Sequence, residues 1–305
     1  MLWQNVFWAG AFGNMKYSRG EKVILGFNHV ILSILSLTML YPFVNIVARS
    51  FSGTQSILRG EVSVFPVDFT TFAWERVFVD RLFVNAISNS SFITVIAVVI
   101  SGAIVILTAY PLSKNYLIAK KVLVTFFVTV MIFRGGPIAQ YMMFRELGIL
   151  NTLWVLILPT ALNIYYILLV QSYFMTIPKD LYAAATIDGA NDYQQLILIA
   201  VPISIPIIAT ITLFNAVAHW NLYQNAVYFI VDTSKYPIMM VVQSIVRSSS
   251  SMAEASLDSD VGIETYGRET IVAASVAFAA LPIILVYPFL QRYFVKGITL
   301  GSIKE

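Results

Sequence analysis

One arginine inside an apolar run is the residue best placed to act on a solute. Arg134 begins the segment Arg134-Gly-Gly-Pro137, which interrupts an apolar run over residues 122–144. A helix that starts at Val122 reaches this break after roughly 18 Å, whereas the hydrocarbon of a bilayer is about 30 Å thick. A charge and irregular backbone at that depth are tolerated only inside protein or beside water. Two interpretations stay open: Arg134 attracts a carboxylate of a passing solute, or it lies at the outer interface with its head in water.

Other polar and aromatic side chains lie in or beside the apolar runs. Flat aromatic faces combined with hydrogen-bonding groups are the side chains that hold sugars, so the set has the composition of a path for a sugar-like solute. Tyrosine and tryptophan are also enriched at membrane–water interfaces, and this alternative applies to Trp220 and Tyr223 in particular. The candidate path residues are Arg134, Gln140, Tyr141, Tyr165, Tyr166, Gln171, Asn215, His219, Trp220, Tyr223 and Asn225.

The sequence lacks the residues that several other kinds of chemistry require. The chain has no cysteine, so disulfides, iron–sulfur clusters and thiolate zinc sites are excluded. Its two histidines, His29 and His219, are too few for a three-histidine metal site. No Gly-x-x-x-x-Gly-Lys-Ser/Thr segment occurs, so ATP binding through a P-loop is not expected. The net charge of +3 gives no indication of nucleic acid. We expect no catalytic residue, metal or cofactor in this chain.

The elements that must position these residues are membrane-spanning helices. The chain is 58% hydrophobic and 11% charged, against about 25% charged residues in a soluble domain. A spanning helix needs about 20 mostly apolar residues. The sequence therefore predicts an all-α membrane protein with spans at 23–48, 83–110, 122–144, 153–174, 196–219 and 271–294. Pro202 and Pro206 should bend the fifth span.

The polar stretches define the remaining organisation. We expect a cytoplasmic arm over residues 1–22, a membrane domain over 23–294 and a cytoplasmic tail over 295–305, without a cleavable signal peptide. Residues 49–82 are predicted to form a folded extramembrane loop and residues 220–270 a long outer segment. Lysine and arginine counts of ten inside against nine outside leave the orientation undecided.

The segment 178–202 is a short, mostly polar helix–turn–helix between two apolar runs. Pro178 suits the position before a helix start, and Asp180 is a candidate N-cap. Gly189 can end this helix in the left-handed conformation, and Asn191 can cap the next one. Spacing alone fits an ordinary membrane loop equally well.

The residue types in this segment carry a family resemblance. Ala184-Ala185, Asp188-Gly189-Ala190 and Val201-Pro202 resemble the EAA loop of bacterial ABC importer permeases, whose coupling helices sit in a groove of the ATPase subunit. Ala183 stands where the motif has glutamate, so any ion pair from there is absent or made elsewhere. We expect Asp188 to brace the loop rather than touch the ATPase. The implied coupling residues are Ala183, Ala184, Ala185, Asp188, Gly189 and Ala190.

The resemblance extends over about residues 20–300. Phe133-Arg-Gly-Gly-Pro-Ile, Leu147-Gly-Ile-Leu-Asn-Thr-Leu-Trp, Leu156-Ile-Leu-Pro and Met175-Thr-Ile-Pro look like the maltose-type second permease, in the subgroup that imports alginate fragments. It implies an inner-membrane protein with both termini in the cytoplasm and a second homologous permease as partner. It also implies an ATPase dimer that holds ATP and magnesium, a periplasmic or lipoprotein solute-binding protein, and an oligosaccharide substrate. Acidic oligosaccharides are the substrate class that we expect first.

The serine-rich stretch 244–268 is the third candidate region. In maltose-type permeases the matching loop reaches into the solute-binding protein, and the flexible composition here suits that role or none. The implied contact residues are Ser248, Ser251, Glu254 and Asp258. A stand-alone secondary transporter or channel is the alternative function, but the predicted spans contain no acidic residue to bind a coupling proton or sodium ion.

Overall fold

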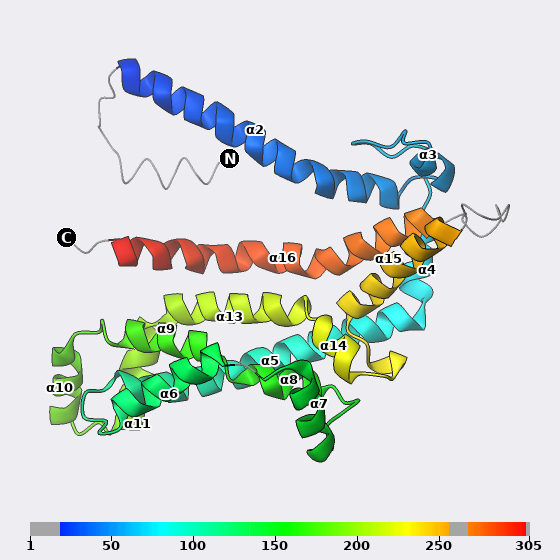
Figure 1. Ribbon diagram of the computed structural model, residues 1–305. Helices are drawn as coiled ribbons and strands as arrows, with labels where there is room; N and C mark the ends of the chain where they lie inside the picture. The colour runs from blue at the N-terminus through cyan, green and yellow to red at the C-terminus, as the bar shows by residue number, and fades with distance from the viewer. Residues whose placement is uncertain (1–18, 134, 256–267, 303–305) are drawn as a thin grey trace.

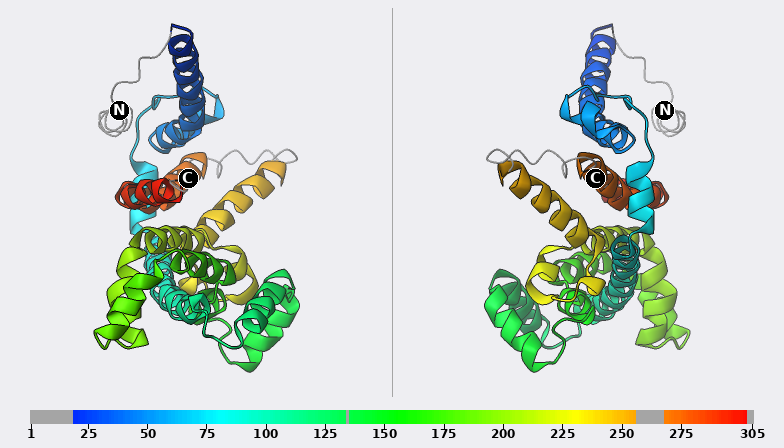
Figure 2. Two further views of the ribbon diagram at one scale, coloured as in Figure 1. Left: turned by 90° about the vertical axis from the view of Figure 1, so that its left-hand side faces the viewer. Right: turned by 90° about the vertical axis from the view of Figure 1, so that its right-hand side faces the viewer.

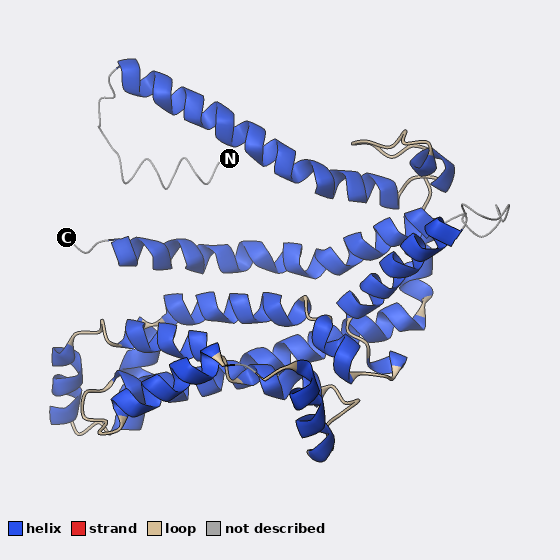
Figure 3. Cartoon of the chain, in the orientation of Figure 1, coloured by secondary structure: helices blue, strands red, loops and turns tan. Residues whose placement is uncertain are grey.

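The computed structural model describes residues 19–133, 135–255 and 268–302, and this part of the chain contains helices and no strand (Figure 3). The long helices are α2 (Arg19–Ser50), α5 (Arg81–Ser113), α13 (Ile205–Trp220), α15 (Ile238–Ala255) and α16 (Arg268–Ser302). The shorter ones are α3 (Thr54–Leu58), α4 (Phe72–Val79), α6 (Lys120–Ile132), α7 (Pro137–Glu146), α8 (Trp154–Ala161), α9 (Ile164–Phe174), α10 (Lys179–Ile187), α11 (Asp192–Gln195), η1 (Leu196–Ala200), α12 (Val201–Ile203), α14 (Gln224–Phe229) and η2 (Thr233–Lys235).

Helix length and composition confirm the all-α membrane fold. In the described ranges α2, α5 and α16 are each long and apolar enough to cross a bilayer. Three bent pairs of helices meet the same criterion: α6 with α7 at 112°, α8 with α9 at 40°, and the segment Asp192–Ile203 with α13 at 79°. If each pair is one span, the described residues hold six spans at the predicted positions.

The three bends have local causes. The first falls at the predicted break before Pro137, and the third lies between Pro202 and Pro206, as expected. The second was not predicted: α8 ends at Leu162, and Asn163 starts α9 by accepting the N–H of Tyr166 at 3.3 Å. A polar N-cap thus divides a segment that we expected to be one continuous helix.

Two predicted boundaries differ from the structure. Helix α2 begins at Arg19, inside the stretch assigned to the N-terminal arm, and residues 1–18 lie outside the described ranges. Helix α16 continues to Ser302, past the predicted end of the last span at residue 294.

The bundle has two distinct ends (Figure 1). Helices α10 and α11 lie at one end, together with the start of α2 and the end of α16. Helices α3, α4, α14 and α15 lie at the other end. This arrangement places the loop 178–200 on the same side as both ends of the described chain.

Helix α5 is the centre of the packing, since it contacts α8, α9, α13 and α15. Its buried side chains include Ile93, Ala97 and Val105, each fully buried. By contrast α2 packs on α16 and lies apart from helices α6 to α11 in both views of Figure 2. It joins the rest through its last turns, where Arg49 forms an ion pair with Glu269 at 3.1 Å.

The two long connections are folded. Residues 51–79 form a compact unit, as predicted, in which the ring of Phe51 stacks with those of Phe69 and Trp74. In the segment after α14, the N–H groups of Val231 and Asp232 donate to Asn151 Oδ1 at 3.1 and 3.0 Å. These bonds fix the described start of the long segment 220–270 to the loop before α8.

Buried hydrogen bonds fix the start of α15 to α5. The backbone N–H of Ile238 donates to Ser90 Oγ at 2.8 Å, and both residues are fully buried. Asn89 Nδ2 donates nearby to the carbonyl of Ser234 at 2.8 Å. A buried donor left without its acceptor costs about 1–3 kcal/mol.

Replacing Ser90 with alanine should therefore destabilise the purified protein by about 1–3 kcal/mol, because the N–H of Ile238 loses its acceptor. The measurement is the thermal unfolding midpoint in detergent. Ser88→Ala is the matched control, since Ser88 lies two residues away and is exposed. Equal midpoints for the two variants would contradict the role assigned to Ser90.

Candidate functional site

Helix α10 projects from the end of the bundle and has no buried side chain. Ala183 and Ala184 are exposed and Ala185 is half-buried. Its large apolar residues also face outward, with Leu181 44% and Ile187 87% exposed. The helix therefore presents a small, apolar surface that this chain leaves uncovered.

The end of α10 is built as predicted. Gly189 has φ +82°, in the left-handed region that glycine adopts without strain. Its N–H donates to Thr186 O at 3.1 Å, and the N–H of Ala190 donates to Ala185 O at 2.9 Å. These two bonds form a Schellman motif, which satisfies the last carbonyls of the helix.

The start of α10 corrects one prediction. Pro178 occupies the N-cap position, and no side chain caps the helix. Asp180 lies in the first turn instead, because the helix begins at Lys179, two residues before the start that an N-cap at Asp180 implies. A carboxylate there is still favoured by the helix dipole.

Polar side chains hold α10 and α11 together. Asn191 and Gln194 form a capping box, with each side chain bonded to the other's backbone at 2.9 Å, which confirms the predicted cap. Gln195 Nε2 donates to Thr186 Oγ1 at 3.0 Å and to Ala190 O at 3.2 Å. Sequence reasoning missed Gln195, whose only signal was a polar residue directly before an apolar run.

Asp188 does not brace the loop with its side chain. The residue is the C-cap of α10, and its carboxylate is exposed and has no hydrogen-bond partner among the described residues. Gln195, which is 5% exposed, has the bracing role that we had assigned to Asp188. An amide suits that role because it carries two donors and can bridge two acceptors.

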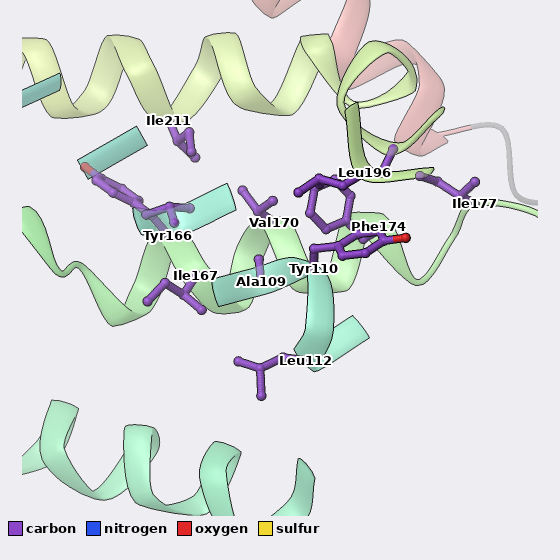
Figure 4. Packing of buried hydrophobic residues seen from close by; sticks show 12 residues of the cluster. Ala109, Tyr110, Leu112, Tyr166, Ile167, Val170, Phe174, Ile177, Leu196 and Ile211 are labelled. Carbon is purple, nitrogen blue, oxygen red and sulfur yellow. The ribbon is translucent and has the colours of Figure 1, made fainter. Parts of the chain in front are cut away.

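The loop rests on an apolar cluster at the end of α5 and α9 (Figure 4). Tyr110 and Phe174 meet edge to face, with ring centroids 6.0 Å apart. Leu196 lies beside them, and the ring of Tyr182 from α10 packs against the same cluster.

Two polar contacts also tie the loop to α5 and the residues after it. Lys114 Nζ lies 3.4 Å from the ring centroid of Tyr182, and Tyr116 Oη donates to Asp192 Oδ2 at 2.9 Å. Burial lowers the pKa of Lys114, although the charge of Asp192 opposes this shift. Burial and the bond to Asp192 both raise the pKa of Tyr116.

Four candidate path residues are enclosed within the subunit. His219 is 3% exposed, with Nε2 2.7 Å from Thr160 Oγ1. Gln171 Nε2 donates to Leu112 O at 3.2 Å, and Trp220 Nε1 donates to Ala279 O at 3.0 Å. Tyr166 is 9% exposed and packs in the cluster beside α5. Gln171 Oε1 is buried without a partner in the described residues, and the other polar groups are bonded or packed inside the chain, so we do not retain these four residues as solute contacts.

The remaining path candidates do not form one surface. Tyr165 is 53% exposed, and Gln140 and Asn225 are half-buried on α7 and α14. Asn215 is 5% exposed and lines a small cavity beside Tyr166. Tyr141 is exposed and Tyr223 half-buried, whereas Arg134 lies outside the described residues. These candidates thus lie on several helices and differ in exposure.

Within the stretch predicted as a flexible outer loop, the described residues 244–255 are helical. Ser248 lies on α15, is exposed, and donates through Oγ to Ile245 O at 2.9 Å. Helix α15 persists because its first turns are anchored by Ile238, Val241 and Val242, which pack against α5 and α16. Asp258 and the side chains of Ser251 and Glu254 lie outside the described structure.

Neither cavities nor metal ligands suggest a reaction centre. The larger cavity, about 280 Å³, lies between α5, α13 and α16 and is lined almost wholly by apolar groups such as Val95, Leu213 and Ile283. Within the described ranges no three His, Cys, Asp or Glu side chains lie close enough together to hold a metal ion. The loop at α10 is thus the best-defined functional candidate.

Comparison with known proteins places this architecture in a family. Residues 121–300 match the family described as binding-protein-dependent transport system inner membrane component. The chain belongs to this family. It is a membrane permease of an ABC importer, and the matched region contains α10 together with α6 to α9 and α11 to α15.

Two relatives from Bacillus subtilis (strain 168) match this permease over most of their length. The polygalacturonan/rhamnogalacturonan transport system permease protein YtcP is 35% identical over 95% of this chain and 100% of the relative. Protein LplC is 33% identical over 91% of this chain and 93% of the relative.

Two solved structures share the fold. One is a bacterial ABC transporter involved in the import of the acidic polysaccharide alginate, with a TM-score of 0.81, 32% identity and coverage of 92% of the permease and 100% of that chain. The other is a bacterial alginate ABC transporter in complex with an alginate pentasaccharide-bound periplasmic protein. It has a TM-score of 0.60 and 14% identity, covers 89% and 94% of the two chains, and supports the fold alone.

The Schellman motif of the permease makes a testable prediction at Gly189. Gly189→Val should disrupt the turn because a β-branched residue is strained at φ +82°. We expect amides in residues 179–195 to exchange hydrogen at least about fivefold faster, since such strain costs about 1–3 kcal/mol. Gly189→Asn is the control, because asparagine tolerates this conformation. Similar exchange in the valine and asparagine variants would show that the turn does not depend on glycine.

Proposed function

We propose that this permease moves acidic oligosaccharides across the bacterial cell membrane, driven by a separate ATPase dimer that docks on the loop 178–200. The observation that carries the proposal is the exposed α10, which is uncovered on its outer face and fixed to the bundle at its base. A helix that is exposed on one face and fixed at its base can transmit a displacement imposed by a partner to the membrane-spanning helices. ATP and magnesium would bind in the partner, in keeping with the lack of a P-loop in this chain.

The arrangement of the chain supports an orientation. The loop lies at the same end of the bundle as the start of α2 and the end of α16 (Figure 1). Docking of a cytoplasmic ATPase on α10 would therefore place both chain ends in the cytoplasm. The opposite end, with α3, α4, α14 and α15, would face the solute-binding protein, and Ser248, Ser251, Glu254 and Asp258 remain our candidates for contacting it.

The exposed spans support a second permease as partner. Large apolar side chains of α2 face outward along its length, including Phe27, Leu37 and Met39 at 67–70% exposure. Lipid can cover part of this surface, but the scattered path residues need a facing surface to enclose a polar solute. A homologous permease would supply that surface and complete a path with Tyr165, Gln140 and Asn225.

The chemistry of the solute rests on the relatives and on Arg134. YtcP is named for polygalacturonan and rhamnogalacturonan, and one similar structure belongs to an importer of the acidic polysaccharide alginate. Polygalacturonan and alginate both carry carboxylates, which an arginine can bind through two parallel hydrogen bonds. We therefore assign Arg134 to attraction of the carboxylates of the oligosaccharide.

The ATPase contact can be tested by affinity purification of the tagged permease from its own membranes. We expect an ATP-binding-cassette subunit to co-purify in a stoichiometric amount. Ile187→Asp should abolish this recovery, because it places a charge on the most exposed apolar side chain of α10. Val231→Asp is the matched control, since Val231 is 82% exposed and lies away from α10. Undiminished recovery with Ile187→Asp would contradict docking on α10.

The substrate class can be tested by uptake into proteoliposomes that contain the intact complex and its solute-binding protein. Uronic-acid oligosaccharides should be imported in preference to neutral ones of equal length. Arg134→Gln should reduce uptake of the acidic sugar by about tenfold or more, the effect of losing a charge-assisted bond of about 1.5–3 kcal/mol. Arg145→Gln is the control, since it removes an arginine nearby in the sequence. Import of neutral sugars only would overturn the substrate assignment.

A further inference from the structure

The side chain of Lys114 lies between two tyrosine rings that belong to different helices. The residue follows the last turn of α5, where its N–H donates to Pro111 O at 3.1 Å. Its Nζ lies 4.5 Å from the ring centroid of Tyr110 on α5 and 3.4 Å from that of Tyr182 on α10. One ammonium group thus contacts both the central helix of the bundle and the exposed helix of the loop.

The two rings act through their faces. The hydroxyl groups of Tyr110 and Tyr182 are buried, and neither has a hydrogen-bond partner in the described part of the chain. A cation within about 6 Å of an aromatic centroid is attracted by the negative face of the ring, and more strongly where water is excluded. Lys114 is half-buried, and burial lowers its pKa, so its charge is partly stripped of water at this position.

Few other contacts fix the orientation of α10. The helix has no buried side chain, and Tyr182 is the member of α10 that packs against the cluster below it. The hydrogen bond between Thr186 of α10 and Gln195 of α11 holds the loop together but does not reach α5. The lysine between the rings therefore joins α10 directly to the helix that packs against α8, α9 and α13.

We propose that Lys114 is a positioning residue that transmits movement of α10 to α5, by holding the rings of Tyr182 and Tyr110 on either side of its ammonium group. The inference rests on the proposed function, because the movement would begin when the ATPase pushes on α10. A displacement of Tyr182 moves Lys114 with it. Lys114 directly follows Ser113, the last residue of α5, so the movement passes to the end of that helix. The push then reaches a span that contacts most of the bundle.

The test uses the intact complex in proteoliposomes, with Lys114→Met and Lys114→Arg in this chain. Methionine keeps the length of the side chain and removes the charge, whereas arginine keeps the charge and stacks on aromatic rings. We expect Lys114→Met to lower the amount of sugar imported per ATP hydrolysed by at least about fivefold, while Lys114→Arg restores most of it. Lys121→Met is the matched control, because Lys121 is an exposed lysine at the start of α6, the next helix after α5.

A structural measurement accompanies the transport assay. Amides of α10 should exchange hydrogen about fivefold faster in Lys114→Met than in the wild type, the factor expected from losing a cation–π contact. Tyr182→Leu should give a similar acceleration, and the double variant should add little to either. Tyr182→Phe should behave as the wild type, since it keeps the ring face and removes a hydroxyl that has no partner.

The outcomes separate this inference from the proposed function. If the wild-type complex neither binds an ATPase nor imports sugar, the proposed function fails. If the wild type is coupled and Lys114→Met has the same ratio of sugar to ATP, the inference alone is overturned. Additive effects of Lys114→Met and Tyr182→Leu on exchange would also overturn it. A slower Lys114→Met complex with an unchanged ratio would indicate a merely structural lysine and reject the proposal.

Discussion

The loop that carries α10 must keep its shape without a core of its own. A helix of nine residues is too short to be stable alone in water, and none of its side chains is buried. Its geometry depends on hydrogen bonds at its carboxyl end and on the contact of Tyr182 with the bundle. The left-handed Gly189 and the bonds from Gln195 close this end, so polar contacts stabilise α10 where apolar burial stabilises α5.

The interior of the bundle obeys a different constraint. Lipid offers no hydrogen-bond partner, so polar groups within the spans must be satisfied inside protein or face water. His219 lies against Thr160, and Trp220 donates to the carbonyl of Ala279. Both bonds join helices that are far apart in the sequence, which gives these residues a packing role in the bundle.

The predictable features are those with a local physical cause. Apolar run length located the spans, and glycine and asparagine located the carboxyl end of α10 and the start of α11, because φ and capping are decided within a few residues. The roles of Gln195 and His219 were not predictable, since their partners come from elsewhere in the fold. Composition also misled: a serine-rich stretch suggested a flexible loop, whereas burial of Ile238 and Val241 stabilises a helix there. Contacts at a distance decide between such alternatives, and spacing does not reveal them.

Ala183 connects the stiffness of the loop to its use. The EAA loop that this segment resembles has a glutamate at this place, whereas the exposed methyl group of Ala183 cannot form an ion pair with a partner. The carboxylates of Asp180 and Asp188 lie at opposite ends of α10, about 12 Å apart along the axis. Docking of the proposed ATPase on α10 would rely mainly on the exposed side chains of Leu181, Ile187 and the alanines. A surface that binds by shape transmits force only if it does not deform, so the loss of the glutamate makes the internal bonds of the loop more important.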